Sequence, residues 1–157
     1  MGDPRKQRKK YETPPHPWQA TRIEKERGLK KSYGLKNKKE IWKMESFLRQ
    51  CKRQAKKLIS RTDEQAKKEE ELLLKKLFNL GIAEKTTKIE DILDFDTHNI
   101  LERRLQTVIH KAGLARTPKQ ARQFIIHQHI LVKDKKVDVP SYVVKREEEG
   151  KITFVEN

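Results

Sequence analysis

The chain has 157 residues, and its 38 Lys and Arg against 23 Asp and Glu give a formal net charge of +15. Hydrophobic residues make up only 34% of it, which is enough for one or two small cores but not for a large one. So large an excess of positive charge repels itself unless a polyanion neutralises it. The phosphate backbone of nucleic acid is the polyanion that this composition predicts.

An anionic membrane surface is the alternative polyanion, and the sequence argues against it. No apolar run approaches the roughly 20 residues needed to span a bilayer. The N-terminus lacks the apolar stretch of a signal peptide. Cys51 is the only cysteine, so no internal disulfide can form, which is typical of a protein in a reducing cytoplasm.

Positive charge concentrates in two regions of the chain. Residues 1–43 carry 14 Lys and Arg against 5 Asp and Glu, and residues 101–145 carry 10 against 3. Acidic residues gather mainly outside these two regions. Two basic regions on either side of a nearly neutral middle predict two places where RNA contacts the chain.

Residues 1–39 are expected to form an extended basic arm rather than a domain, because prolines interrupt the segment and large apolar side chains are sparse. A solvated tail is the alternative. Tyr11, Trp18 and Tyr33 lie among the cations and favour an arm that becomes ordered on RNA, since a flat ring can stack on a base. Deletion of residues 1–39 should then leave the fold intact.

Residues 40–100 are predicted to form a helical domain. Apolar residues recur at steps of three and four through residues 40–59, which indicates an amphipathic helix with Cys51 on its apolar face. A second helix should begin near Thr62, where the spacing is that of a capping box, and end at Gly81. The two helices are expected to pack as an antiparallel pair.

Residues 101–157 are predicted to form a small module of two helices and a short antiparallel sheet, so the fold class is α+β. The first helix should cover about residues 97–112, and the second should begin with Thr117 as N-cap and Pro118 at its first position. The hydrophobic period then changes to two. The strands are expected at residues 130–132, 137–139, 142–144 and 152–154, with a basic turn at 133–136.

The start of the second helix in this module is a candidate anion site, because the amides of a helix N-terminus attract negative charge. Arg116, Lys119 and Arg122 are placed around it, and His129 and Lys133 lie where the helix passes into the first strand. Such a convex basic surface suits structured RNA, which is recognised largely through its shape and backbone.

Several segments of the C-terminal half resemble the RNA-binding module of the small-subunit ribosomal protein S-four family, which contains the αL motif. The resemblance lies in Leu101–Thr107, Gly113–Thr117, Ala121–Gln123, His129–Val132 and Val139–Tyr142, so that the motif covers about residues 101–144. Upstream, residues 33–42 are similar to the archaeal and eukaryotic branch, and the opening Met1–Pro4 suggests an archaeal member.

The resemblance implies a structural constituent of the small ribosomal subunit, in the cytoplasm, that binds small-subunit rRNA early in assembly at a multi-helix junction of the 5′ domain. Neighbouring small-subunit ribosomal proteins would be further partners, and so would mRNA, because bacterial members lie near the channel through which mRNA enters. The implied RNA contacts are Arg103, Arg104, Arg116, Lys119, Arg122, His129, Lys133 and Tyr142. Arg104 has a second interpretation, an internal ion pair with the helical domain.

Neither an enzyme nor a metal or cofactor site is expected. The sequence has no Gly-rich phosphate loop and no nucleophile–base set. His127 and His129 are two residues apart, but no third ligand follows at a fixed spacing, and the zinc-binding cysteine cluster of many bacterial family members is missing. Two other functions stay open: a pre-rRNA-binding assembly factor and a general cationic RNA chaperone.

Overall fold

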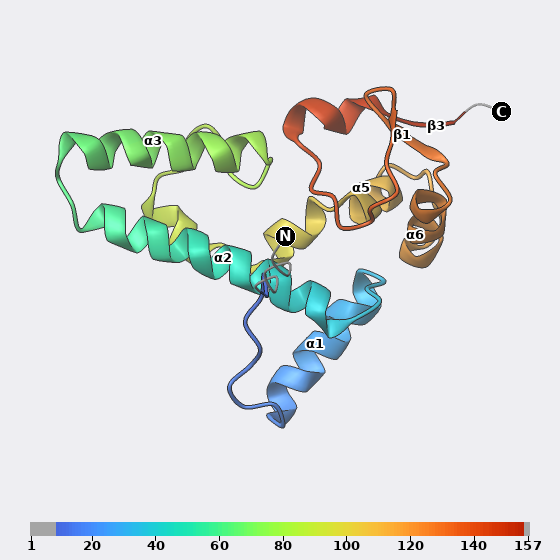
Figure 1. Cartoon of the computed structure of the whole chain (residues 1–157), viewed down its shortest axis with the longest axis horizontal. Coiled ribbons are helices and arrows are strands. Elements are labelled where there is room, and N and C mark those ends of the chain that lie inside the picture. The colour runs from blue at the N-terminus through green and yellow to red at the C-terminus, as the bar shows by residue number, and fades with distance from the viewer. Residues whose placement is uncertain (1–8, 156–157) are drawn as a thin grey trace, which may run out of the picture.

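Six α-helices, two 3-10 helices and three short strands make up residues 9–155, which the computed structural model describes (Figure 1). The α-helices are α1 (Ala20–Ser32), α2 (Lys38–Ile59), α3 (Glu64–Asn79), α4 (Thr97–Glu102), α5 (Leu105–Lys111) and α6 (Pro118–Ile126). The 3-10 helices are η1 (Glu90–Asp94) and η2 (Arg146–Lys151), and the strands are β1 (Ile130–Val132), β2 (Lys135–Lys136) and β3 (Ile152–Phe154). The predicted α+β class is confirmed. Within residues 9–155, no helix is long and apolar enough to cross a membrane.

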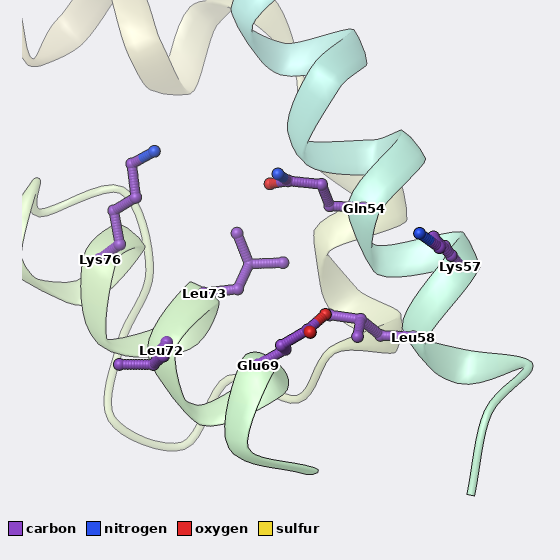
Figure 2. Close-up of a pocket in the computed structure, with 7 residues that line it drawn as sticks. All are labelled: Gln54, Lys57, Leu58, Glu69, Leu72, Leu73 and Lys76. Carbon is purple, nitrogen blue, oxygen red and sulfur yellow. The ribbon is translucent and has the colours of Figure 1, made fainter. Parts of the chain in front are cut away.

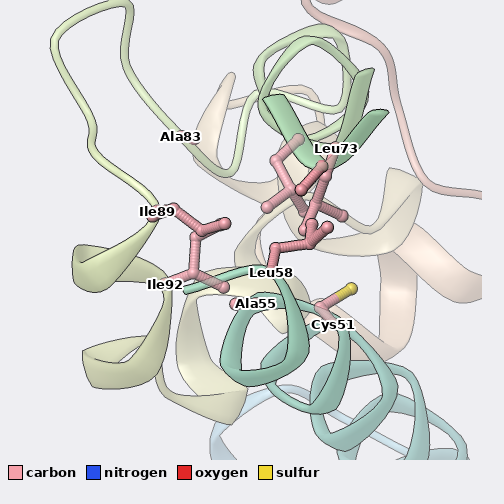
Figure 3. Packing of buried hydrophobic residues seen from close by; sticks show 9 residues of the cluster. Cys51, Ala55, Leu58, Leu73, Ala83, Ile89 and Ile92 are labelled. Carbon is pink, nitrogen blue, oxygen red and sulfur yellow. The ribbon is translucent and has the colours of Figure 1, made fainter. Parts of the chain in front are cut away.

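The C-terminal half of α2 and the helix α3 form the predicted antiparallel pair (Figure 1). Their apolar stripes meet in a core that includes Cys51, Leu58 and Leu73, and η1 closes it with Ile92 (Figure 3). Cys51 is a small buried hydrophobe, as predicted. The predicted capping box at Thr62 is wrong, because α3 begins one residue later, with Asp63 as N-cap and no side-chain cap hydrogen bond.

The segment before α2 differs from the predicted extended arm, because residues 20–32 form the helix α1. The sequence of α1 has little apolar periodicity, and Glu26, a charged residue, is the only one that this helix buries. The Glu26 carboxylate accepts hydrogen bonds from Arg22 and from Trp42 Nε1, the latter at 2.9 Å, and lies 3.0 Å from Lys38 Nζ. Three donors thus compensate a buried charge, which an apolar pattern cannot reveal. Residues 1–8 of the predicted arm lie outside the described part.

The turn between α1 and α2 belongs to a hydrophobic core. Leu35 is buried against Ile41 and Leu101. Gly34 adopts a φ of +60°, and a Cβ there would lie 2.8 Å from the Pro118 Cβ, so the chain can approach α6 only with glycine at this place. The premise that residues 1–39 contribute few side chains to a core does not hold at Leu35, and that deletion of these residues leaves the fold intact stays a prediction. The predicted domain boundaries after residues 39 and 100 stay predictions.

The helix predicted over residues 97–112 is broken into α4 and α5 at Arg103 and Arg104. Arg104 has an extended backbone, with φ −72° and ψ 140°, and forms a β-bridge with Val143. The Leu105 amide donates to the Tyr142 carbonyl at 2.7 Å. The apolar stripe continues across this break, so the sequence periodicity did not reveal it. The break turns both arginine side chains into the protein.

The C-terminal sheet has the order β2-β1-β3, with antiparallel pairing on both sides of β1. The turn between β1 and β2 is shorter than predicted, because Lys133 and Asp134, with φ of 47° and 66°, form it alone. Positive φ at both central residues is typical of the tight hairpin turn that matches the twist of the strands. The strand predicted at 137–139 is therefore wrong, and 142–144 contributes only the bridge at Val143. The predicted strands at 130–132 and 152–154 are confirmed.

We expect Leu35→Ala to lower the free energy of unfolding by about 2–5 kcal/mol, because it removes a buried side chain from a core that joins the segment before α2 to α4. Urea denaturation measures this change. Leu72→Ala removes the same atoms from an exposed position on α3 and should cost no more than about 0.5 kcal/mol. Equal effects of the two substitutions would show that residues 33–35 do not contribute to the core.

Candidate nucleic-acid interface

One carboxylate joins the start of α2 to the C-terminal module. The carboxylate oxygens of Glu40, in the first turn of α2, lie 2.5 Å from Arg104 Nη2 and 3.2 Å from Arg122 Nη2. Gln106, beside them, donates to the carbonyl oxygens of Gly34 and Pro118 at 3.1 Å and 2.8 Å. Two guanidinium groups thus share one carboxylate at this contact.

The charges at this contact perturb one another. Burial by itself would raise the pKa of Glu40, but the hydrogen bonds and positive charges of Arg122 and Arg104 outweigh it, and the pKa lies below its ordinary value. Burial lowers the pKa of Arg104, and the neighbouring Arg122 lowers it further, although Glu40 opposes the shift. The ion pairs therefore hold Glu40 charged and stabilise the contact between the two regions.

Two of the predicted RNA contacts, Arg103 and Arg104, have side chains that are directed into the protein. The Arg104 side chain is only 1% exposed and is bound to Glu40, so its internal interpretation is the right one. Arg103 is 13% exposed, pairs with Glu149 at 2.8 Å, and donates to the carbonyl oxygens of Leu80 and Val144. Both residues stabilise the fold because the break between α4 and α5 directs them inward.

Arg116 and Lys119 lie exposed at the start of α6, where the sequence predicted an anion site. The predicted capping is confirmed, since the Gln120 amide donates to Thr117 Oγ1 at 3.2 Å. Neither cation makes a salt bridge to any residue of the described part of the chain. Their charges are therefore free to meet an anion from outside. Arg122 lies one turn further and is partly engaged by Glu40.

The other predicted contacts lie on the sheet side of the module. His129 is exposed, with its ring edge against Phe124. Lys133 lies 3.5 Å from a Glu148 oxygen, and Tyr142 donates its hydroxyl to Glu148 at 2.8 Å. Burial by itself would raise the pKa of Glu148. The contacts with Tyr142 and Lys133 outweigh this effect, so the pKa lies below its ordinary value. Lys133 and Tyr142 thus support η2, while a third of the Lys133 side chain stays exposed.

The sequence analysis missed two adjoining basic hollows along α2. The first, here called the junction pocket, has a volume of about 370 Å³ and lies between α2 and the C-terminal module. It is lined by Tyr11, Asn37, Lys39, Glu40, Lys43, Met44, Arg104, Arg122, Pro140 and Ser141. The second, the arm pocket, has about 540 Å³ and is lined by Lys9, Lys10, Tyr11, Glu12, Lys43, Ser46, Phe47, Arg49, Gln50 and Arg53.

The two hollows adjoin, since they share Tyr11 and Lys43, and together they are here called the basic groove. The chain before α1 forms one wall of this groove, because the Glu12 amide donates to Ser46 Oγ at 2.9 Å and the Tyr11 ring lies against Trp42. The signal in the sequence was the spacing of the basic and polar residues of α2 at steps of three and four, from Lys39 onward, on the side opposite to the core.

A third hollow, of about 380 Å³, opens between the C-terminal end of α2 and residues 69–76 of α3 (Figure 2). Leu72 and Leu73 line it together with Glu69 and two lysines, Lys57 and Lys76. It shares no lining residue with the basic groove. Among the described residues, no cluster of three His, Cys, Asp or Glu side chains could hold a metal ion.

Comparison with known proteins places these features in context. The S4 domain family model matches residues 103–149, which include α5, α6 and the hairpin. A small ribosomal subunit protein uS4 of Methanothermobacter thermautotrophicus is 53% identical over 154 residues, which cover 98% of this chain and 90% of that protein. The uS4 protein of Methanococcus aeolicus is 52% identical over 100% of this chain and 89% of its own length. The similarity therefore extends over the helical region as well as the module.

We expect Glu40→Gln to lower the free energy of unfolding by about 3–5 kcal/mol, because it leaves the buried Arg104 without its counter-charge. Chemical denaturation at neutral pH measures the loss. Glu102→Gln is the matched control, since Glu102 forms an exposed pair with Lys111 that should contribute less than about 1 kcal/mol. A loss no larger than that of the control would mean that Glu40 does not hold the two regions together.

Acid should destabilise the protein, because the pKa values of Glu26, Glu40 and Glu148 are all below the ordinary value of 4.5. A lowered pKa contributes stability that is fully present above the unfolded value and is lost as the pH falls through the folded one. Urea unfolding at pH 7, 5, 4 and 3 should show this loss below about pH 5. Burial raises the pKa of Glu45, which opposes the trend. Glu40→Gln should make the decline shallower, and an unchanged decline would contradict the assignment.

Proposed function

This chain belongs to the family of small ribosomal subunit protein uS4, and from this we propose that it binds small-subunit rRNA early in assembly, at a multi-helix junction of the 5′ domain. The family consists of structural ribosomal proteins and not of enzymes. The chain accordingly has a structural role in the ribosome, in the cytoplasm. Because the similarity covers nearly the whole chain, the proposal applies to the helical region and the module together.

The observation that carries this proposal is the set of basic groups that the fold leaves without internal partners. Arg116 and Lys119 at the start of α6, and Lys39 and Lys43 on α2, make no salt bridge within residues 9–155. They lie on the two regions that Glu40 joins. Phosphate groups would neutralise such charges with release of counterions, which makes the binding of RNA favourable and dependent on salt.

Two finer parts of the proposal rest on the family resemblance alone. They are a position near the channel through which mRNA enters, as in the bacterial members, and contacts with mRNA and with neighbouring small-subunit proteins. A pre-rRNA-binding assembly factor is the alternative, and it would leave before the subunit matures. A general cationic RNA chaperone would have no fixed site on rRNA.

Chemical footprinting of the protein on small-subunit rRNA, with excess competitor RNA, tests the proposal. Protection confined to one junction of the 5′ domain is the expected result. Diffuse protection that the competitor removes would leave only a cationic chaperone. If the protein is retained in mature subunits in stoichiometric amounts, the assembly-factor alternative is excluded. If the protein is absent from mature subunits, the structural role is wrong.

We expect Arg116→Gln with Lys119→Gln to weaken rRNA binding and to reduce its salt dependence by about 1.5 units of log–log slope, because two phosphate contacts are lost. Filter binding at several salt concentrations measures the slope. Lys67→Gln with Lys68→Gln is the control, since it removes two exposed charges from α3, outside the basic groove. If the control reduces the slope as much as the test pair does, the start of α6 is not a specific contact.

A further inference from the structure

We propose that the junction pocket binds one phosphate group of the RNA backbone, held between α2 and the C-terminal module. This inference rests on the proposed function, since it takes RNA as the source of the phosphate. The pocket was not predicted from the sequence, and six of its ten lining residues lie outside the residues that match the S4 domain.

Positive charge exceeds negative charge in the junction pocket. Four cations line the pocket, namely Lys39, Lys43, Arg104 and Arg122, and Glu40 is its only carboxylate. Glu40 already serves both arginines. The lysines have no acidic partner in the described part of the chain. A hollow with so much uncompensated positive charge attracts an anion, and its low-dielectric walls strengthen the attraction.

The buried guanidinium of Arg104 lacks part of its hydrogen bonds. Nε and Nη1 of Arg104 are buried and have no hydrogen-bond partner. Only Nη2 is bound, to Glu40. A buried charged donor without a partner is unfavourable by itself, and most such groups in proteins are compensated. An anion in the adjoining hollow would compensate the charge of this guanidinium through space, and Arg122, which is partly exposed, would contact it.

The N-terminus of α2 adds positive potential at the pocket. Asn37 is the N-cap and makes no side-chain cap hydrogen bond, so the first amides of a 22-residue helix are not capped by it. Asn37 and Ser141 both line the pocket, from opposite regions of the chain. The partial positive charge of the helix N-terminus adds to that of the lysines, and a phosphate group is the ligand that such an arrangement favours.

The arm pocket indicates that the phosphate belongs to a polymer. It continues from the junction pocket at Tyr11 and Lys43 and adds Lys9, Lys10 and Arg53 beyond them. A free anion needs one site, whereas an RNA strand needs a track of positive charge along its backbone. The phosphate in the junction pocket would contact both regions that Glu40 joins, so binding of RNA would also hold these regions in one relative orientation.

The test compares Lys39→Gln with Lys43→Gln against the control Lys67→Gln with Lys68→Gln in the full chain. Both pairs remove two exposed charges, so neither is expected to disturb folding. The first measurement is thermal unfolding during titration with inorganic phosphate, at constant ionic strength set with chloride. The melting temperature of the wild type and of the control should rise and saturate, and the rise should be lost in the Lys39/Lys43 pair.

The second measurement is the salt dependence of rRNA binding by the same variants. The Lys39/Lys43 pair should reduce the log–log slope by about 1.5 units, and the control should leave it unchanged. A phosphate titration that shifts all proteins equally, or none of them, would overturn the pocket. The Lys39/Lys43 substitutions could abolish the phosphate-induced rise in melting temperature but leave the salt dependence of rRNA binding unchanged. The pocket would then bind free anions only, and its assignment to RNA would be wrong.

The two proposals fail in different ways. If the wild type protects no single junction of small-subunit rRNA, the proposed function is wrong, and the phosphate titration still decides whether the pocket binds an anion. If the wild type protects one junction but the Lys39/Lys43 pair binds rRNA with the same slope as the wild type, the function stands and the pocket inference is wrong.

Discussion

The ion pairs of Glu40 with Arg104 and Arg122 join the first turn of α2 to the C-terminal module. A buried guanidinium that loses its counter-charge lowers the free energy of unfolding by about 3–5 kcal/mol. The carboxylate at the start of α2 therefore determines where the C-terminal module can lie. The same helix carries α1 on its first turns and α3 on its last ones (Figure 1). One ion triad thus positions the basic groups of both regions relative to each other.

The positive charge of the chain is divided between two tasks. Arg103, which donates three directed hydrogen bonds, and Arg104, whose Nη2 is bound to Glu40, lie largely inside and stabilise the fold. Lysines such as Lys39 and Lys43 stay at the surface of the basic groove. This division follows from the planar guanidinium, which is weakly hydrated and tolerates burial in an ion pair, whereas the ammonium group is strongly hydrated. Directed contacts thus withdraw most of Arg103 and Arg104 from the surface, whereas the lysines of the basic groove stay exposed; Arg122 combines both, since it pairs with Glu40 and is still partly exposed.

The sequence predicted the elements whose signals are local. Steps of three and four located α2, and Thr117 with Pro118 located the start of α6. The sequence predictions were wrong where the local structure depends on contacts with residues that are distant in the sequence. The helix α1 is held by its buried Glu26, whose hydrogen-bond donor Trp42 lies 16 residues away. The break between α4 and α5 depends on pairing with Val143, and the length of the hairpin turn depends on the register of β1 and β2.

Composition, periodicity and short motifs were enough to predict the α+β class, a polyanionic partner and the resemblance to a ribosomal protein family. The division of the candidate arginines between the interior and the surface, and the two adjoining hollows along α2, became visible only in the folded chain. The reason is physical: Glu40 and Arg104 are 64 residues apart, and the energy of their pairing depends on burial that no local pattern encodes.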